Sequence, residues 1–130
     1  MAINVSWVDQ NKEIVLIKYE KRWTWDEFQE KVDATNALIS SVNYPVVLIH
    51  DTLQGSVLPP GNIIAQGKMA FAGAADNVAL IIVVVNSSMI QTFLSLVTQL
   101  IPSKHGQIIK IVSSLEEAYQ LAQETRSNPA

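Results

Sequence analysis

The amino-acid sequence predicts a single α/β domain with a mixed sheet of about five strands, and three observations lead to that class. The chain has 130 residues, which suits one domain with a sizeable core. Apolar strand-like runs alternate with amphipathic segments, as expected for parallel strands joined by crossover helices. Two strand-like runs at the start flank a short polar turn, which predicts an antiparallel hairpin. We expect the order β-β-α-β-α-β-α-β-α, with four helices covering the sheet, over residues 1–125, and a polar tail over 126–130.

The hairpin is predicted from hydrophobic periodicity. Ile3, Val5 and Trp7 are spaced by two, which places their side chains on one face of a strand. The polar segment 9–12 then reads as a turn, and the run 13–20, EIVLIKYE, as the second strand.

The first helix is predicted to begin after Thr24. Thr24 and Glu27 form a T-x-x-E capping box, and Trp23 and Phe28 occupy the flanking positions of a hydrophobic staple. The positions that follow step by three and four, so that one stripe faces the sheet: Trp25, Phe28, Val32, Thr35, Ile39 and Val42, with Leu38 beside them. We interpret these aromatic residues as helix cap and core.

The remaining elements alternate between buried strands and helices. The run 77–86, NVALIIVVVN, shows no alternation, which is typical of a central strand buried on both faces of a parallel sheet. A second capping box, Ser114 with Glu117, predicts the start of the last helix. The other elements are predicted as a strand at Val46–Ile49, a helix over about 62–75, a helix over about 87–101, and a strand at 107–112.

Composition excludes several classes of function. The formal net charge is −3 and no basic stripe is present, so nucleic acid is not an expected partner. The absence of cysteine removes disulfides, thiolate nucleophiles and zinc-thiolate sites, and we predict no metal site and no cofactor. The longest wholly apolar run, 78–85, is far shorter than the roughly 18 residues that span a bilayer. We expect a soluble cytoplasmic protein without a membrane span.

The turn region 49–62, IHDTLQGSVLPPGN, is the predicted ligand site, because parallel-sheet proteins bind ligands where strands end and helices begin. The candidate binding residues are Asp51, Thr52, Ser56, Gly61 and Asn62. An alternative is that Asp51 or Asn62 only caps the following helix.

No catalytic residue is predicted. His50 beside Asp51 suggests a general base oriented by a carboxylate. Adjacent residues of a strand point to opposite faces, however, so the two side chains should not share one cleft. The sequence also carries no metalloprotease, nucleophile-elbow or phosphate-loop motif.

The order of these elements and several local phrases resemble the STAS superfamily, the anti-sigma-factor-antagonist-like domains. The resemblance rests on the N-terminal hairpin, WTWDEF, the PVVLIHD strand, the uninterrupted apolar strand and the closing SSLEEAYQLA, and it covers nearly the whole chain. It is strongest to small stand-alone bacterial members that are grouped with CRAL-TRIO-like lipid-binding domains. The resemblance implies either a regulatory interaction module or a lipid carrier.

Regulatory members of that superfamily carry an acidic residue, a phosphorylatable Ser or Thr and a Gly after the third strand. Here the corresponding stretch reads SVLPPGN, and Pro59 and Pro60 stand in the Asp-Ser region. Ser56 and Thr52 lie a few residues earlier. We therefore expect the module to lack the phosphorylation switch.

The segment 77–103 contains no charged residue, although it includes a whole predicted helix. At about 100° per residue one arc of that helix is polar but uncharged, and we call it the neutral arc: Ser88, Gln91, Thr92, Ser95, Thr98 and Gln99. Because interface cores are depleted in charge, the neutral arc predicts a homodimer interface or, alternatively, a groove for an apolar ligand. A further alternative is an uncharged surface that binds nothing.

Two functions follow from the sequence. The first is a non-enzymatic STAS-like interaction module, expected to be a homodimer that contacts protein partners. The second is a small carrier of an apolar or lipid-like molecule.

Overall fold

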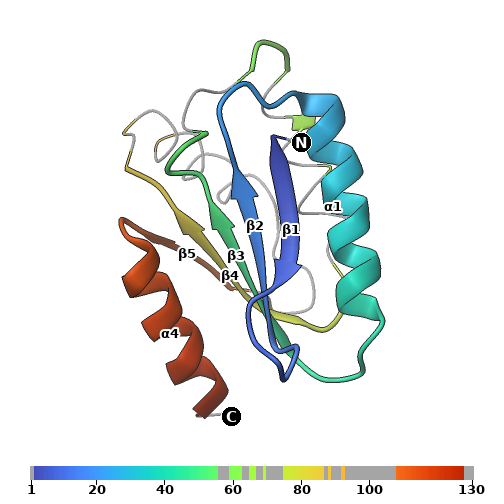
Figure 1. Ribbon diagram of the computed structural model, residues 1–130, viewed down its shortest axis with the longest axis vertical. Coiled ribbons are helices and arrows are strands. Elements are labelled where there is room, and N and C mark those ends of the chain that lie inside the picture. The colour runs from blue at the N-terminus through green and yellow to red at the C-terminus, as the bar shows by residue number, and fades with distance from the viewer. Residues whose placement is uncertain are drawn as a thin grey trace.

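The computed structural model describes residues 2–55, 59–62, 65–66, 69, 75–86, 88, 92 and 108–127 (Figure 1). Five strands form one mixed sheet, which confirms the predicted α/β class. In chain order they are β1 (Ile3–Trp7), β2 (Ile14–Tyr19), β3 (Val46–Asp51), β4 (Val78–Val84) and β5 (Ile108–Val112).

The strands lie in the sheet in the same order as in the chain. β1 pairs antiparallel with β2, whereas β2, β3, β4 and β5 run parallel to one another, as the sequence predicts. β4 is an interior strand but not the middle one, because β3 occupies the third position. β3 also extends to Asp51, two residues beyond its predicted end, so His50 and Asp51 belong to the strand.

Two helices are defined within the described residues, α1 (Trp25–Ser40) and α4 (Leu115–Ser127). The expectation of four helices is therefore not borne out. The segments 62–75 and 87–101, where the other two were predicted, lie mostly outside the described residues. Within them, the described Ala65, Gln66 and Met69, and likewise Ser88 and Thr92, are helical.

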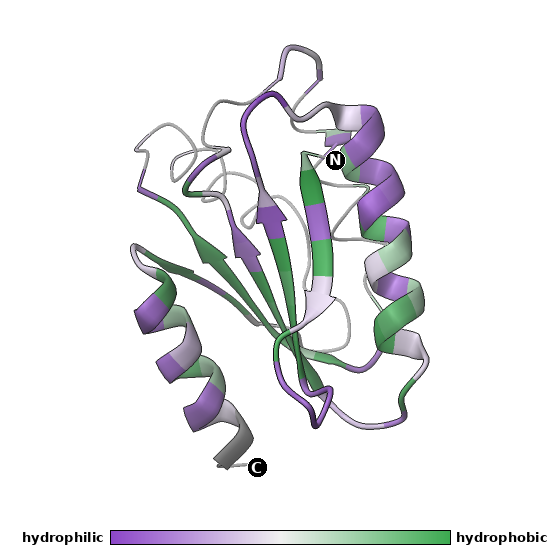
Figure 2. Ribbon diagram, viewed as in Figure 1, coloured by the Kyte–Doolittle hydropathy of each residue, from purple (hydrophilic) through white to green (hydrophobic). Residues whose placement is uncertain are grey.

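Each face of the sheet has its own core. On the α1 side, alternate strand residues pack with the helix, including Ile17, Leu48 and Ile81, together with Ile39 of α1. On the other side the intervening strand residues pack against Ala118 of α4 and its neighbours. β3 and β4 contribute to both cores, which explains why their sequences are apolar without alternation. Figure 2 shows the contrast with β1, whose residues alternate between hydrophobic and hydrophilic.

The start of α1 follows the predicted cap, with one difference. The Thr24 hydroxyl accepts the backbone N–H of Glu27 at 3.1 Å, and the rings of Trp23 and Phe28 lie 5.9 Å apart as in a hydrophobic staple. The carboxylate of Glu27, however, accepts the backbone N–H of Ile3 at 3.1 Å. Glu27 thus ties the helix to the first residue of β1.

The end of α1 is held by a residue from the start of the fourth strand. The side-chain amide of Asn77 donates to the carbonyls of Ile39, Val42 and Tyr44 at 2.9, 3.2 and 3.0 Å. The Ile39 carbonyl lies in the last turn of α1, where intrahelical partners run out, and the other two belong to the connection that leads to β3. Asn77, which immediately precedes β4, therefore holds the connection between α1 and β3 in place.

α4 begins at the second predicted cap. The Ser114 hydroxyl accepts the backbone N–H of Glu117 at 3.1 Å. In the part of the chain that the structure describes, no helix is long and apolar enough to cross a membrane.

Candidate functional site

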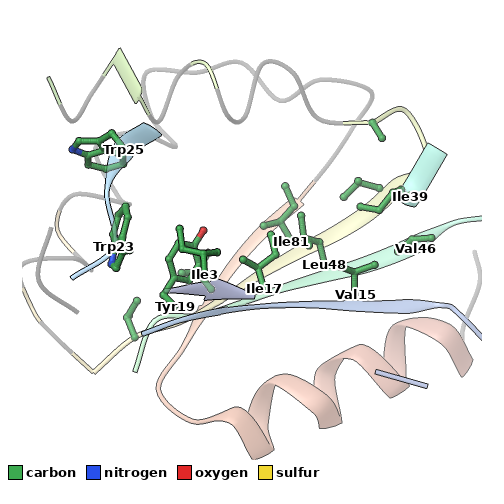
Figure 3. Close-up of a cluster of buried hydrophobic side chains, with 14 residues drawn as sticks. Ile3, Val15, Ile17, Tyr19, Trp23, Trp25, Ile39, Val46, Leu48 and Ile81 are labelled. Atoms are coloured by element: carbon green, nitrogen blue, oxygen red, sulfur yellow. The ribbon is translucent and has the colours of Figure 1, made fainter. Parts of the chain in front are cut away.

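The ends of β2 and β3 carry a cluster of aromatic side chains on the α1 side of the sheet. Tyr19 ends β2, His50 lies near the end of β3, and the loop and first turn of α1 add Trp23, Trp25 and Phe28. Neighbouring rings meet at centroid distances of 4.9 to 6.3 Å, and the contacts of Trp23 with Tyr19 and Trp25 are edge-on. Figure 3 shows Tyr19 over the sheet, with Trp23 and Trp25 extending beyond its end. We call these five residues the aromatic cluster.

Both tryptophans of this cluster hold the segment that follows β3. Trp23 Nε1 donates to the carbonyl of Gly55 at 2.9 Å, and Trp25 Nε1 donates to the carbonyl of Pro59 at 3.1 Å. A buried indole N–H needs such an acceptor, so the two bonds position this segment as well as satisfy the rings.

Gly55 is required by this close approach. A Cβ at Gly55 would lie 2.8 Å from the Cβ of Tyr19 and 2.9 Å from the carbonyl oxygen of Glu20. Gly61 has φ +136°, a conformation that residues with a side chain rarely adopt, and it lies against the ring of Trp25. Gly55 and Gly61 thus allow the backbone of the turn region to pack closely against the aromatic cluster.

Tyr19 and His50 form the polar pair of the site. The Tyr19 hydroxyl and His50 Nδ1 are 2.8 Å apart, and the two rings stack with centroids 5.8 Å apart. Burial lowers the pKa of His50 from 6.5 to about 4, and burial raises the pKa of the Tyr19 phenol. Both groups are therefore neutral at pH 7.

This pair is poorly suited to proton transfer. A general base works best when its pKa is near the working pH, and the pKa of His50 lies well below it. Its Nδ1 is also engaged with Tyr19. The geometry is that of a hydrogen bond joining the ends of two parallel strands.

Asp51 and Thr52 are both buried, with exposures of 7% and 8%. The Asp51 carboxylate accepts the backbone N–H of Leu53 at 3.1 Å. The Thr52 hydroxyl donates to the carbonyl of Val84 at 2.7 Å, and its backbone N–H reaches the same oxygen at 3.1 Å. Both predicted ligand-binding side chains are thus engaged within the protein: Asp51 holds the turn that follows β3, and Thr52 joins the end of β3 to that of β4.

Gly61 and Asn62 are exposed. The Asn62 side chain accepts the backbone N–H of Ala65 at 3.2 Å, and its carbonyl accepts the N–H of Gln66 at 3.1 Å. This is the geometry of a helix N-cap, the alternative that the sequence left open. Ser56, the remaining predicted ligand residue, lies outside the described residues.

His50 and Asp51 point to opposite faces of the sheet, as their adjacency in a strand predicts. His50 stacks on Tyr19 on the α1 side. Asp51 lies towards α4. There the pKa of Tyr119 is raised by the burial of its own phenol and by the negative charge of Asp51. The structure does not bring the two into one site.

Two residues of the neutral arc are described. Ser88 and Thr92 are helical and exposed. Gln91, Ser95, Thr98 and Gln99 lie outside the described residues, so the arc as an interface stays a prediction.

The sequence did not reveal the pairing of Tyr19 with His50 or the bonds from the tryptophans to the turn region. One signal was available, because buried Trp N–H groups need acceptors. Within the described ranges, no group of three or more His, Asp or Glu residues could hold a metal ion.

No model of a protein family, no curated protein and no solved structure matches this chain.

Proposed function

We propose that this protein is a non-enzymatic interaction or regulatory module of the STAS-like type, which acts through protein contacts and forms a homodimer. The observation that carries the proposal is the state of the polar groups at the carboxyl ends of the parallel strands. His50 and Thr52 form hydrogen bonds to neighbouring strands, and Asp51 accepts the backbone N–H of Leu53. Groups engaged in this way stabilise the fold and are not preorganised for a substrate.

The strand order supports the same proposal. In open α/β sheets, ligands bind where the strand order reverses and neighbouring connections diverge. Here the parallel strands follow one another in chain order from β2 to β5. The parallel strands therefore form no such reversal at which a small molecule could bind, and this favours binding of a protein partner to the outer surfaces of the domain.

Native mass spectrometry of protein purified from its host tests the proposal in one measurement. We expect twice the mass of the chain and no additional bound mass. A chain that stays monomeric up to high micromolar concentration would contradict the homodimer. A stoichiometric apolar ligand would favour the carrier instead, since a carrier encloses its cargo in an apolar cavity.

Phosphate-dependent regulation is part of the same test. The intact mass reports any covalent phosphate, and we expect none, because Thr52 is buried and its hydroxyl is bonded to Val84.

A further inference from the structure

The outer edge of β1 presents backbone groups that the sheet does not use. The N–H of Val8 bonds to the carbonyl of Ile14, and the N–H of Glu20 bonds to the carbonyl of Ala2. In an antiparallel pair the backbone groups of successive residues point to alternate sides. The even-numbered residues of β1 therefore bond to β2, and Ile3, Val5 and Trp7 direct their N–H and C=O groups outward.

One of these outward groups already has a partner from the same chain. The N–H of Ile3 donates to the carboxylate of Glu27. In the described part of the chain, the N–H and C=O groups of Val5 and Trp7 have no hydrogen-bond partner. Glu27 therefore occupies the outer edge of β1 at Ile3, and the backbone groups of Val5 and Trp7 remain available for hydrogen bonds.

The two edges of the sheet differ in their protection. A charged residue or a proline on an edge strand discourages pairing with another chain. β5, at the far edge, carries the exposed Lys110 at its centre. β1 reads INVSW and contains neither a charge nor a proline.

We infer that β1 pairs antiparallel with β1 of a second copy, which joins the two sheets into one. The inference rests on the proposed homodimer and assigns its contact to this edge in place of the neutral arc. A twofold axis at Val5 sets Val5 against its own copy, with two hydrogen bonds between them. Two more join the N–H of Trp7 to the C=O of Ile3 in the other copy. The C=O of that Trp7 then faces the Ile3 N–H, where it would replace the Glu27 carboxylate as the acceptor.

The side chains of β1 are self-complementary in this register. Asn4 and Ser6 are exposed on one face and would lie opposite each other across the axis. Val5 and Trp7 are half-buried on the α1 face, where the two copies of Val5 would lie against each other. Ile3, which lies opposite Trp7 of the second copy, is already buried within its own chain. Polar residues thus meet polar ones and apolar residues meet apolar ones, without placing like charges in contact.

The first test uses proline at two neighbouring positions. Val5→Pro removes an N–H that points away from β2, so it should leave the fold intact and weaken the dimer about tenfold or more, as measured by sedimentation at several concentrations. Ser6→Pro removes an N–H that bonds to β2, so it should instead lower the midpoint of thermal unfolding. A difference between the two variants would show that the N–H of Val5 points away from β2 and that the N–H of Ser6 points towards it.

The second test uses charge and does not depend on proline being tolerated. Asn4→Glu with Ser6→Lys places opposite charges across the axis, whereas Asn4→Glu with Ser6→Glu places like charges there. Both pairs lie on the exposed face of β1 in the monomer. We expect the like-charged protein to dimerise about tenfold more weakly than the oppositely charged one.

The outcomes separate this inference from the proposed function. Equal dimerisation of the two charge variants, with Ser95→Glu producing monomers, would overturn the edge contact and leave the homodimer standing on the neutral arc. A wild-type protein that is monomeric at high micromolar concentration would overturn both.

Discussion

The hydroxyl of Tyr19 and Nδ1 of His50 lie 2.8 Å apart and join the ends of two neighbouring parallel strands. The bond is made by a half-buried imidazole that burial keeps neutral, with a pKa near 4. Protonation of His50 therefore places a charge where burial has removed the solvent that would stabilise it, and this couples the stability of the fold to pH.

We predict that His50 makes the protein less stable in acid. Because the pKa of His50 is about 4 in the folded protein and 6.5 when unperturbed, the unfolded chain binds the proton more readily between these values. The contribution is present in full above pH 6.5 and is lost as the pH falls towards 4. It amounts to about 3 kcal/mol.

Denaturant unfolding at a series of pH values measures this contribution. The control is His50→Phe, which keeps an aromatic ring and cannot be protonated. The free energy of unfolding of the wild type should fall more steeply than that of the variant between pH 6.5 and 4. Parallel curves for the two proteins would show that His50 titrates normally.

Gly55→Ala should destabilise the fold by about 1 to 3 kcal/mol, because an added Cβ meets the Tyr19 side chain and the Glu20 carbonyl at less than van der Waals separation. Part of the cost arises because the bond of Trp23 to the Gly55 carbonyl must shift. The exposed neighbour Gln54 gives the control, Gln54→Ala. Thermal unfolding followed by tryptophan fluorescence reports both effects, and equal midpoints for the two variants would contradict the close approach.

The strands could be predicted from the sequence because their signals are local. Alternation in β1 and the uninterrupted apolar runs of β3 and β4 depend only on which faces are buried. The positions of both helix starts were also local, since Thr24 and Ser114 cap residues three positions on.

The contacts that shape the candidate site are not local, and for that reason the sequence did not predict them. The capping-box pattern assigns the Glu27 carboxylate to its own helix start, but the folded chain brings Ile3 to it. The pairing of Tyr19 with His50 likewise depends on the register of β2 against β3. Local patterns carry no information on either distance.

Loss of either helix cap should cost about 1 kcal/mol in the free energy of unfolding. Thr24→Ala removes the hydroxyl that accepts the N–H of Glu27, and Ser114→Ala removes the corresponding acceptor at α4. Ser113→Ala, one residue before the cap, serves as the control. Urea unfolding measures all three variants, and midpoints unchanged from the wild type would mean that the caps add nothing to stability.

Asn77→Ala should destabilise the protein by about 1 to 3 kcal/mol, because it leaves three carbonyls, one in the last turn of α1 and two just after it, without their shared donor. Asn77→Asp should be worse. It places a negative charge beside those carbonyls and at the negative end of the helix dipole. The exposed Asn86 provides the control, Asn86→Ala, and urea unfolding should rank control, alanine and aspartate variants in that order.

Incubation with host lysate and ATP should not give stoichiometric phosphate on Thr52 or Ser56. For Thr52 the reason is structural, since its hydroxyl is buried and donates to the Val84 carbonyl, so a kinase would have to unpair β3 from β4 to reach it. For Ser56 the reason is the proposed STAS-like assignment, under which Pro59 and Pro60 stand where regulatory members carry the acceptor residue. Phosphopeptide mapping checks both sites. Full occupancy at Thr52 would mean that the end of β3 opens readily, and full occupancy at Ser56 would restore a phosphorylation switch to the proposed module.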